Sequence, residues 1–131
     1  GTDGAVWGSA IAISDTSVAV WAPEYLGNGV GLLADEAGTI YRTTDNWVTK
    51  STITTLDGAA DDMVYLGNGI VVYSTYTSLK NFYVSYNYGL HGSWSLLGNI
   101  GSNQIDHLIA YSHDGLLGLA TTENGKVVTF Y

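Results

Sequence analysis

The amino-acid sequence predicts an all-β protein, and three observations lead to this prediction. Short runs rich in Val, Ile, Thr and Tyr are separated by turns of Gly, Asn and Asp. The turn Leu26-Gly27-Asn28-Gly29 recurs forty residues later as Leu66-Gly67-Asn68-Gly69, and a weaker copy stands at Ser112-His113-Asp114-Gly115. Only 12% of the 131 residues are charged, which suits short strands better than amphipathic helices. A unit of about 40 residues with four short strands has the size of one β-propeller blade.

The middle unit shows its four strands best. They are expected at residues 62–66, 70–73, 82–86 and 94–97. Asn68-Gly69 lies between the first two and favours a type I′ hairpin, because both turn positions take a positive φ. We therefore predict one domain, residues 1–131, made of three four-stranded antiparallel propeller blades. Its parts are a fourth strand at 6–13, a blade at 18–54, a blade at 61–98 and a partial blade at 105–131.

Tryptophans follow the same repeat. Trp7 precedes Asn28 by 21 residues, and Trp47 precedes Asn68 by 21. Trp94 precedes Asp114 by 20 residues. The spacing predicts equivalent places for these side chains in successive units.

Two segments extend this reading to a family. Thr43-Thr44-Asp45-Asn46-Trp47 and Ser85-Tyr86-Asn87-Tyr88-Gly89, the latter followed by Trp94, resemble degenerate Asp-boxes of the sialidase-like (BNR repeat) propellers. In that family the box lies between the third and fourth strands, its acidic side chain caps backbone amides, and its tryptophan packs between blades. The resemblance implies that Trp47 and Trp94 are largely buried. It implies a fold and carries no activity.

The two ends of the sequence complement one another. Residues 105–131 supply three strands, whereas Thr2-Asp3-Gly4 and residues 6–13 have the form of an Asp-box-like turn and a fourth strand. Propellers have four to eight blades, so three blades do not easily close a ring. We expect the N-terminal strand to complete the C-terminal blade in cis or in trans. A homo-oligomer follows, with two chains giving six blades, or incorporation into a larger propeller or virion assembly.

Charge and composition exclude several partners. The net charge of −8 would repel nucleic acid. The apolar runs are far shorter than the ~20 residues that span a bilayer, so membrane insertion is not expected. Cysteine is absent, which excludes disulfides and thiolate zinc sites. We expect an extracellular or virion-surface protein.

Catalysis is not expected. Sialidase-like hydrolysis needs an arginine cluster, but Arg42 is the one arginine of the sequence and is expected to pair with Asp45 or another surface carboxylate. A glycoside hydrolase needs two suitably spaced carboxylates, and Asp61 and Asp62 would point to opposite faces of a strand. No cofactor is expected, and the histidines lack the spacing of a metal site. A calcium ion on Asp61, Asp62 or Asp106 is an alternative that no EF-hand-like spacing supports.

The candidate binding residues lie in the loops that should gather on one face of the propeller. Aligned on the repeated turn, Trp21, Asp61 and His107 are equivalent but differ in chemistry. Aromatic rings beside carboxylates are a common way to hold sugars. The predicted ligand-binding residues are Trp21, Asp61, Asp62, Tyr76, Asp106 and His107, with Lys80 and Glu123 in the same loops. We predict a non-enzymatic, carbohydrate-binding surface module. The alternatives are a structural subunit of a virion, tail or extracellular filament, a fragment of a glycoside hydrolase, and a water-filled channel lining.

Overall fold

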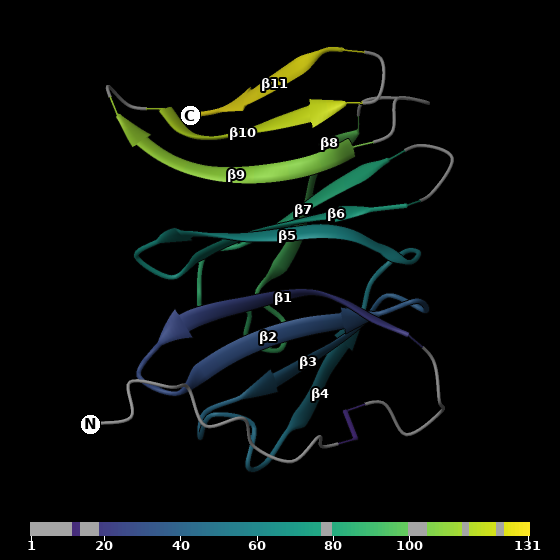
Figure 1. The fold of residues 1–131 in the computed structure, drawn as a ribbon, viewed down its shortest axis with the longest axis vertical. Coiled ribbons are helices and arrows are strands. Elements are labelled where there is room, and N and C mark those ends of the chain that lie inside the picture. Colours follow the sequence, from purple (N-terminus) through teal and green to yellow (C-terminus); the bar gives the residue numbers. More distant parts are fainter. Residues whose placement is uncertain (1–11, 14–18, 77–79, 100–104, 114–115, 123–124) are drawn as a thin grey trace, which may run out of the picture.

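A computed structural model describes residues 12–13, 19–76, 80–99, 105–113, 116–122 and 125–131 (Figure 1). The regular structure of these residues is entirely β, and it forms three antiparallel sheets. The first sheet contains β1 (Val20–Gly27), β2 (Val30–Asp35), β3 (Thr39–Thr43) and β4 (Ser51–Thr55). The second contains β5 (Ala60–Gly67), β6 (Ile70–Thr75), β7 (Asn81–Ser85) and β8 (Trp94–Asn99). The third contains β9 (Ile105–His113), β10 (Leu116–Thr122) and β11 (Val127–Phe130).

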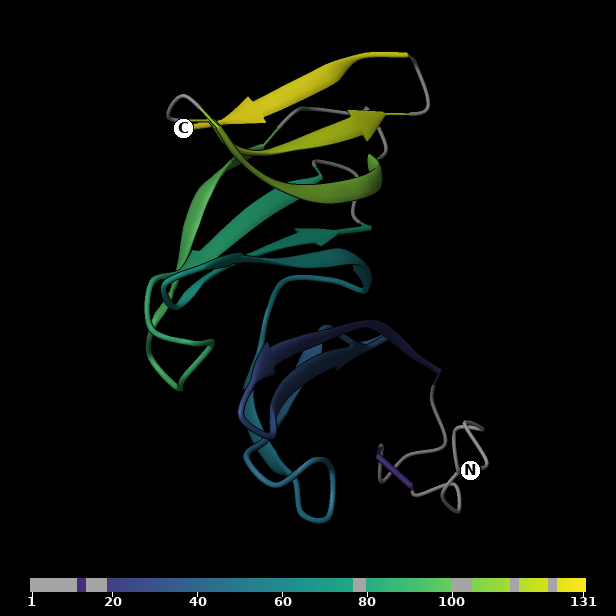
Figure 2. The ribbon, with the colours of Figure 1, turned by 60° about the vertical axis from the view of Figure 1, so that its left-hand side comes forward.

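The three sheets are stacked, with the second between the other two (Figures 1 and 2). The first strands of the sheets, β1, β5 and β9, are neighbours, and the later strands of each sheet follow in chain order toward its outer edge. This is how propeller blades surround an axis. The predicted all-β fold class and antiparallel four-stranded sheets are confirmed.

The predicted N-terminal strand at 6–13 falls almost wholly outside the described residues. Residues 12 and 13 are described, and they belong to none of the strands. The Lys50 ammonium group donates a hydrogen bond to the carbonyl oxygen of Ile13. Lys50 immediately precedes β4, so this part of the chain lies beside the first sheet.

The repeated Asn-Gly turns are type I′ hairpins, as predicted. Asn28 and Gly29 have φ of 52° and 79°, and Asn68 and Gly69 have φ of 51° and 81°. The tyrosine that precedes each turn closes it. The amide of Gly29 donates to the Tyr25 hydroxyl at 3.2 Å, and the second sheet repeats this bond at 3.4 Å between Gly69 and Tyr65. The tyrosines of the repeat therefore cap their own hairpins.

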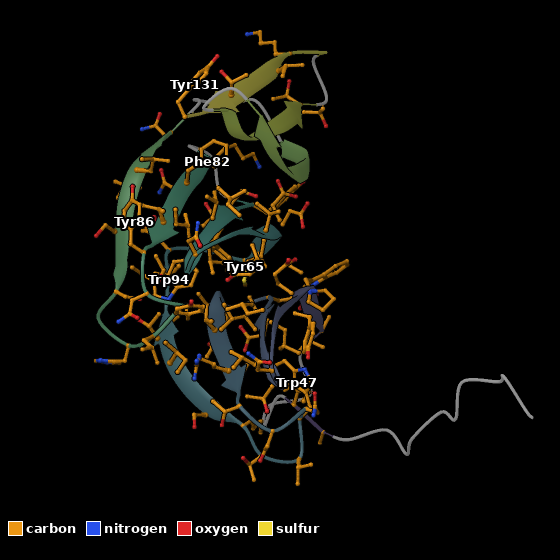
Figure 3. All side chains as sticks on the ribbon, turned by 90° about the vertical axis from the view of Figure 1, so that its left-hand side faces the viewer. Trp47, Tyr65, Phe82, Tyr86, Trp94 and Tyr131 are labelled. Carbon is orange, nitrogen blue, oxygen red and sulfur yellow. The ribbon has the colours of Figure 1, made fainter. Side chains whose placement is uncertain are left out.

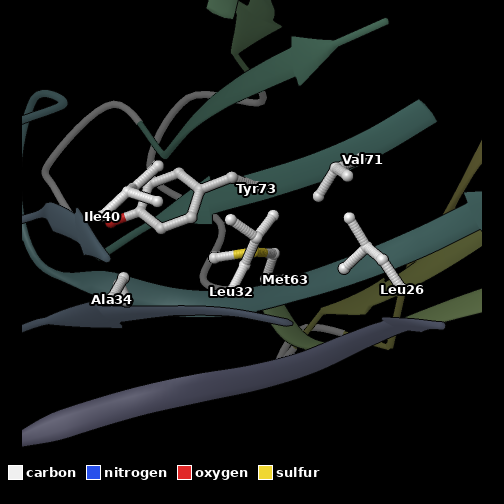
Figure 4. Packing of buried hydrophobic residues seen from close by; sticks show 8 residues of the cluster. Leu26, Leu32, Ala34, Ile40, Met63, Val71 and Tyr73 are labelled. Atoms are coloured by element: carbon white, nitrogen blue, oxygen red, sulfur yellow. The ribbon is translucent and has the colours of Figure 1, made fainter. Parts of the chain in front are cut away.

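Two apolar clusters join the sheets. The larger lies between the first and second sheets, where Leu32, Ile40 and Tyr73 are each 0% exposed (Figure 4). The smaller unites Val72, Phe82 and Val84 of the second sheet with Ala120 and Val128 of the third. The alternation of large apolar residues along β6 gives both faces of the second sheet a partner.

Hydroxyl groups organise the turns between the third and fourth strands. The amides of Asp45 and Trp47 donate to Thr43 Oγ1 at 3.2 and 2.9 Å. Ser85 Oγ accepts in the same way from Asn87 and Gly89 at 3.2 and 3.0 Å. These turns lie where the Asp-box comparison placed them, between β3 and β4 and between β7 and β8.

The tryptophans of the two turns are not equivalent, which corrects the even spacing inferred from the sequence. Trp94 begins β8, donates through Nε1 to the Gly89 carbonyl at 3.2 Å and meets the Tyr73 ring edge-on at 6.3 Å. Trp47 lies inside its turn at φ 66° and covers Gly31 of its own sheet. Figure 3 shows Trp94 between the first two sheets and Trp47 away from that interface. Both are partly buried, less than predicted.

Arg42 also departs from expectation. Its Nε donates to the Tyr88 carbonyl at 3.2 Å, which links β3 of the first sheet to the β7–β8 turn of the second. Asp45 is instead held by Thr49, which donates through its hydroxyl at 2.6 Å and its amide at 2.8 Å. The expected pairing of Arg42 with Asp45 is therefore wrong, because Arg42 binds a backbone carbonyl of the second sheet and the Asp45 carboxylate is held by Thr49.

Candidate binding site between the first two sheets

A hollow of about 380 Å³ opens between the ends of the first and second sheets. Its walls bring together three of the residues predicted from sequence, Trp21, Asp61 and Tyr76. Trp21 is 51% exposed and Tyr76 is 53% exposed, so both rings are accessible from solvent. The full lining is Trp21, Glu36, Ala59, Ala60, Asp61 and Tyr76.

The hollow is formed by positions that are equivalent in the forty-residue repeat, but an aromatic residue in one sheet corresponds to an acidic residue in the other. Trp21 and Asp61 are forty residues apart, near the start of the first strand of their sheets. Glu36 and Tyr76 are also forty residues apart and follow the second strands. Each sheet thus supplies one aromatic ring and one carboxylate in the opposite order. Glu36 was not predicted, but the forty-residue repeat applied to Tyr76 identifies it.

Matching backbone hydrogen bonds hold these positions. The amide of Glu36 donates to the Ala19 carbonyl at 3.1 Å, and the amide of Tyr76 donates to the Ala59 carbonyl at 2.7 Å. Each bond ties the chain after the second strand to the chain before the first. The two side chains therefore project from the same corner of successive sheets.

Irregular pairing orients the residues of the first strands. The register of β1 against β2 shifts between Trp21 and Glu24, and Ala22 has φ of 50°. The register of β5 against β6 shifts between Ala60 and Asp62, which leaves Asp61 in the bulge. Bulges redirect side chains and recur beside functional sites. Here both bulges border one hollow.

The loops under the hollow are fixed in place. Asp35 is 2% exposed, and its Oδ1 accepts from the amides of Ala37 and Thr39, each at 2.9 Å. Gly38 comes so close to the next connection that an added Cβ would lie 2.3 Å from the Gly58 carbonyl oxygen. The Tyr73 hydroxyl donates to that same oxygen at 3.2 Å. The loops that carry Glu36 and Ala59 are thereby packed against each other.

Burial determines the state of the Tyr73 hydroxyl. Burial first, and then the nearby charge of Asp35, raise the pKa of Tyr73 well above its ordinary value. The phenol stays protonated and remains a donor to Gly58 throughout the range in which proteins are stable.

Lys80 contacts Tyr76, one of the two aromatic walls of the hollow. Its ammonium group lies 3.8 Å from the centroid of the Tyr76 ring, a cation–π contact, and the residue is only 7% exposed. Next to it, Asn81 Nδ2 donates to Asp57 Oδ2 at 3.2 Å. One aromatic ring of the hollow is therefore held by a buried cation.

The hollow favours neutral or cationic ligands. Glu36 and Asp61 supply carboxylates, and none of the lining residues is a cation. Two exposed rings offer flat apolar surfaces, and the carboxylates offer acceptors. This combination can stack on a sugar ring and accept its hydroxyl protons, or hold the cationic side chain of a peptide.

Asp62 lies outside the hollow. Its Oδ1 accepts from the amide of Met63 at 2.8 Å, and its own amide donates to Ser74 Oγ at 3.1 Å. It acts on Glu24 of β1: burial raises the pKa of Glu24, the amide of Tyr65 lowers it, and the charge of Asp62 raises it. The net pKa is raised. Asp62 thus belongs to the contact of β1 with β5.

Asp106 and His107 both lie in β9, the first strand of the third sheet, where His107 pairs with Thr121. Their side chains are outside the described part of the structure, as is Glu123. In the portion that is described, no three or more Asp, Glu or His side chains are grouped as metal ligands. Likewise, the described residues contain no helix long and apolar enough to cross a membrane.

Comparisons with known proteins support the fold. No protein-family model matches the sequence, and no curated protein does. A solved structure, YCF48 bound to D1 peptide, is similar over 94% of this chain with a TM-score of 0.63 and 20% sequence identity. The similarity covers 40% of that chain, so the present chain spans well under half of its length. The likeness, together with the three antiparallel sheets, shows that this chain has a β-propeller fold.

Proposed function

We propose that this chain is a non-catalytic recognition module that binds carbohydrate in the hollow between the first two sheets and acts as a homo-oligomer. The observation that carries the proposal is the crossed arrangement of two exposed rings and two carboxylates at equivalent corners of successive sheets. The surrounding core keeps the repeated frame, whereas these four side chains differ between repeats. Such divergence at a rigid, open hollow is typical of a binding site.

The proposal excludes a sialidase-like hydrolase. The hydroxyl-capped turns agree with a degenerate Asp-box propeller, but the one arginine of the sequence is used between sheets, where it binds the Tyr88 carbonyl. No arginine cluster is left to bind an anionic sugar. A glycoside hydrolase fragment would need Glu36 or Asp61 as catalytic acid, and loss of hydrolysis in a Glu36→Gln variant would be its signature.

A peptide is the second candidate ligand. The similar YCF48 structure contains a bound peptide, and the carboxylates and rings of the hollow suit a lysine or arginine side chain. A purely structural role in a virion, tail or extracellular filament is the remaining rival. In either binding case we propose an extracellular or virion-surface location.

The decisive experiment screens the whole chain against a glycan array and a peptide array, each with and without chelator. A specific glycan signal that Trp21→Ala and Tyr76→Ala each reduce at least about tenfold supports carbohydrate binding. Val48→Ala is the control, since Val48 is 83% exposed and lines neither this hollow nor a second one between the second and third sheets. Peptide signals alone would assign the second candidate, and no signal on either array would favour the structural role.

A further inference from the structure

Aromatic rings and carboxylates alternate around the hollow between the first two sheets. Trp21 and Asp61 lie near the starts of β1 and β5, whereas Glu36 and Tyr76 follow β2 and β6. Each ring therefore has one carboxylate in its own sheet and a second at the equivalent position of the neighbouring sheet. A ligand that stacks on either ring lies close to a carboxylate of both sheets.

The lining of this hollow does not balance the charge of its two carboxylates. Glu36 is exposed, and none of the described lining residues is an arginine, lysine or histidine. Lys80 contacts the ring of Tyr76, but Lys80 is only 7% exposed and is not part of the lining. The whole chain adds a net charge of −8. A cleft lined by charges of one sign concentrates ligands of the opposite sign.

A buried hydroxyl group near the hollow is affected by the same negative charges. The pKa of Tyr73 is raised, first by burial and then by the charges of Asp35, Tyr83 and Asp61. Asp35 directly precedes Glu36 and is 2% exposed. The ends of the two sheets therefore carry a buried carboxylate in addition to the two that line the hollow.

A sugar with a protonated amino group suits this combination of groups. Its ring has an apolar face that can stack on Trp21 or Tyr76. Its ammonium group can form charge-assisted hydrogen bonds with Glu36 or Asp61, and an ammonium ion is also attracted to the face of a tryptophan ring.

The rival ligands use only part of the hollow. A neutral sugar can stack on the rings, but it would cover the carboxylates without a compensating positive charge, which costs free energy. A lysine side chain brings the positive charge but has no flat apolar face. An acidic sugar would be repelled by both carboxylates.

The size of the hollow also favours a short sugar. Its volume of about 380 Å³ is near the lower end of the range of small-molecule sites, ~300–1,000 Å³. We propose that the hollow selects a short sugar with a free, protonated amino group over the neutral form of the same sugar. The inference rests on the carbohydrate binding of the proposed function and names the class of sugar.

Calorimetric titration of the intact chain with two matched disaccharides tests the inference. One is β-1,4-linked diglucosamine with both amines free, and the other is the same disaccharide with both amines acetylated. The two share their rings and linkage, and at about pH 6 the free amines are protonated. We expect the free-amine form to bind at least about tenfold more tightly at low ionic strength. The difference should shrink as salt is added.

A matched pair of variants assigns the preference to the hollow. Glu36→Gln removes one charge from the lining and keeps the length of the side chain. We expect it to reduce the preference to about threefold or less, while the acetylated disaccharide binds nearly as it does to the wild type. Asp45→Asn is the control, because it removes one charge from the β3–β4 turn, at the other end of β3 and outside the hollow. This control should keep the full preference.

The outcomes separate this inference from the proposed function. Equal binding of the two disaccharides, tighter binding of the acetylated form, or a preference that Glu36→Gln leaves intact would overturn the inference alone. The same holds if neither disaccharide binds but another glycan on the array does. If no glycan binds, both the inference and the proposed carbohydrate binding fail, and binding of a short oligolysine peptide would then assign the hollow to a cationic peptide.

Discussion

Glu36 and Tyr76 occupy the same corner of successive sheets, and each donates its backbone amide to an alanine carbonyl forty residues from the other's acceptor. Their side chains face one hollow with opposite chemistry. The backbone is thus the same in the two sheets, and the asymmetry of the site comes from the side chains alone. The rigidity of that frame can be tested apart from ligand binding.

The Tyr73 hydroxyl bond should contribute to stability. We expect Tyr73→Phe to lower the free energy of unfolding by about 0.5–1.5 kcal/mol, because the Gly58 carbonyl loses its donor inside the core. Tyr83→Phe is the matched control, since Tyr83 packs beside Tyr73 at a ring distance of 6.5 Å. Urea unfolding monitored by tryptophan fluorescence measures both, and equal losses would contradict the assignment.

Close approach of two loops makes Gly38 sensitive to substitution. Gly38→Ala places a Cβ against the Gly58 carbonyl at a φ of 81°, so the variant should lose more than about 1 kcal/mol. Gly92→Ala has the same kind of strain, at φ 74°, with nothing within 4 Å of the added Cβ. The excess loss of Gly38→Ala over Gly92→Ala in thermal unfolding isolates the loop contact. No excess would mean that the loops are free to separate.

The two turn tryptophans should differ in their contribution to stability. Trp94→Ala removes an edge-on contact with Tyr73 and a side chain packed on the larger core cluster, and we expect a loss of about 3 kcal/mol. Trp47→Ala uncovers Gly31 at the outer face of the first sheet and should cost clearly less. Chemical denaturation of both variants decides the order. A larger loss for Trp47 would contradict the arrangement of the sheets.

Asp45 should make stability depend on acid pH. Hydrogen bonds from the Thr49 side chain and amide, and then from Thr43, lower the pKa of Asp45. Because the folded pKa lies below the unfolded value, the stabilisation is present above about pH 4 and is lost as the pH falls through the folded pKa. The stability difference between wild type and Asp45→Ala should therefore shrink below about pH 4. Urea midpoints measured from pH 6 to pH 2 test this, and a constant difference would refute it.

The sequence predicted the strands well because the repeat and the Asn-Gly turns are local signals. The second sheet spans 60–99 where 61–98 was expected, and both Asn-Gly turns have positive φ. Tryptophan spacing misled, because the β7–β8 turn holds its tryptophan at the start of the strand and the β3–β4 turn holds Trp47 inside. Glu36 was missed because a single exposed acid after a strand has no local signal. Glu36 becomes a candidate only because it lines the same hollow as Tyr76, and the two residues come together only when the first two sheets stack.

Arg42 has a consequence for how such a chain can evolve. Its guanidinium fastens the first sheet to the turn of the second, whereas the matching position of the second sheet is the apolar Val84, which faces the third. The equivalent position is therefore polar in the contact between the first and second sheets and apolar in the contact between the second and third. Exchanging or duplicating whole repeats would bring an arginine against an apolar neighbour, or leave the Tyr88 carbonyl without its donor. The contacting faces of neighbouring sheets are chemically matched, and this fixes the order of the repeats. Recombination would therefore have to change both contacting faces at once.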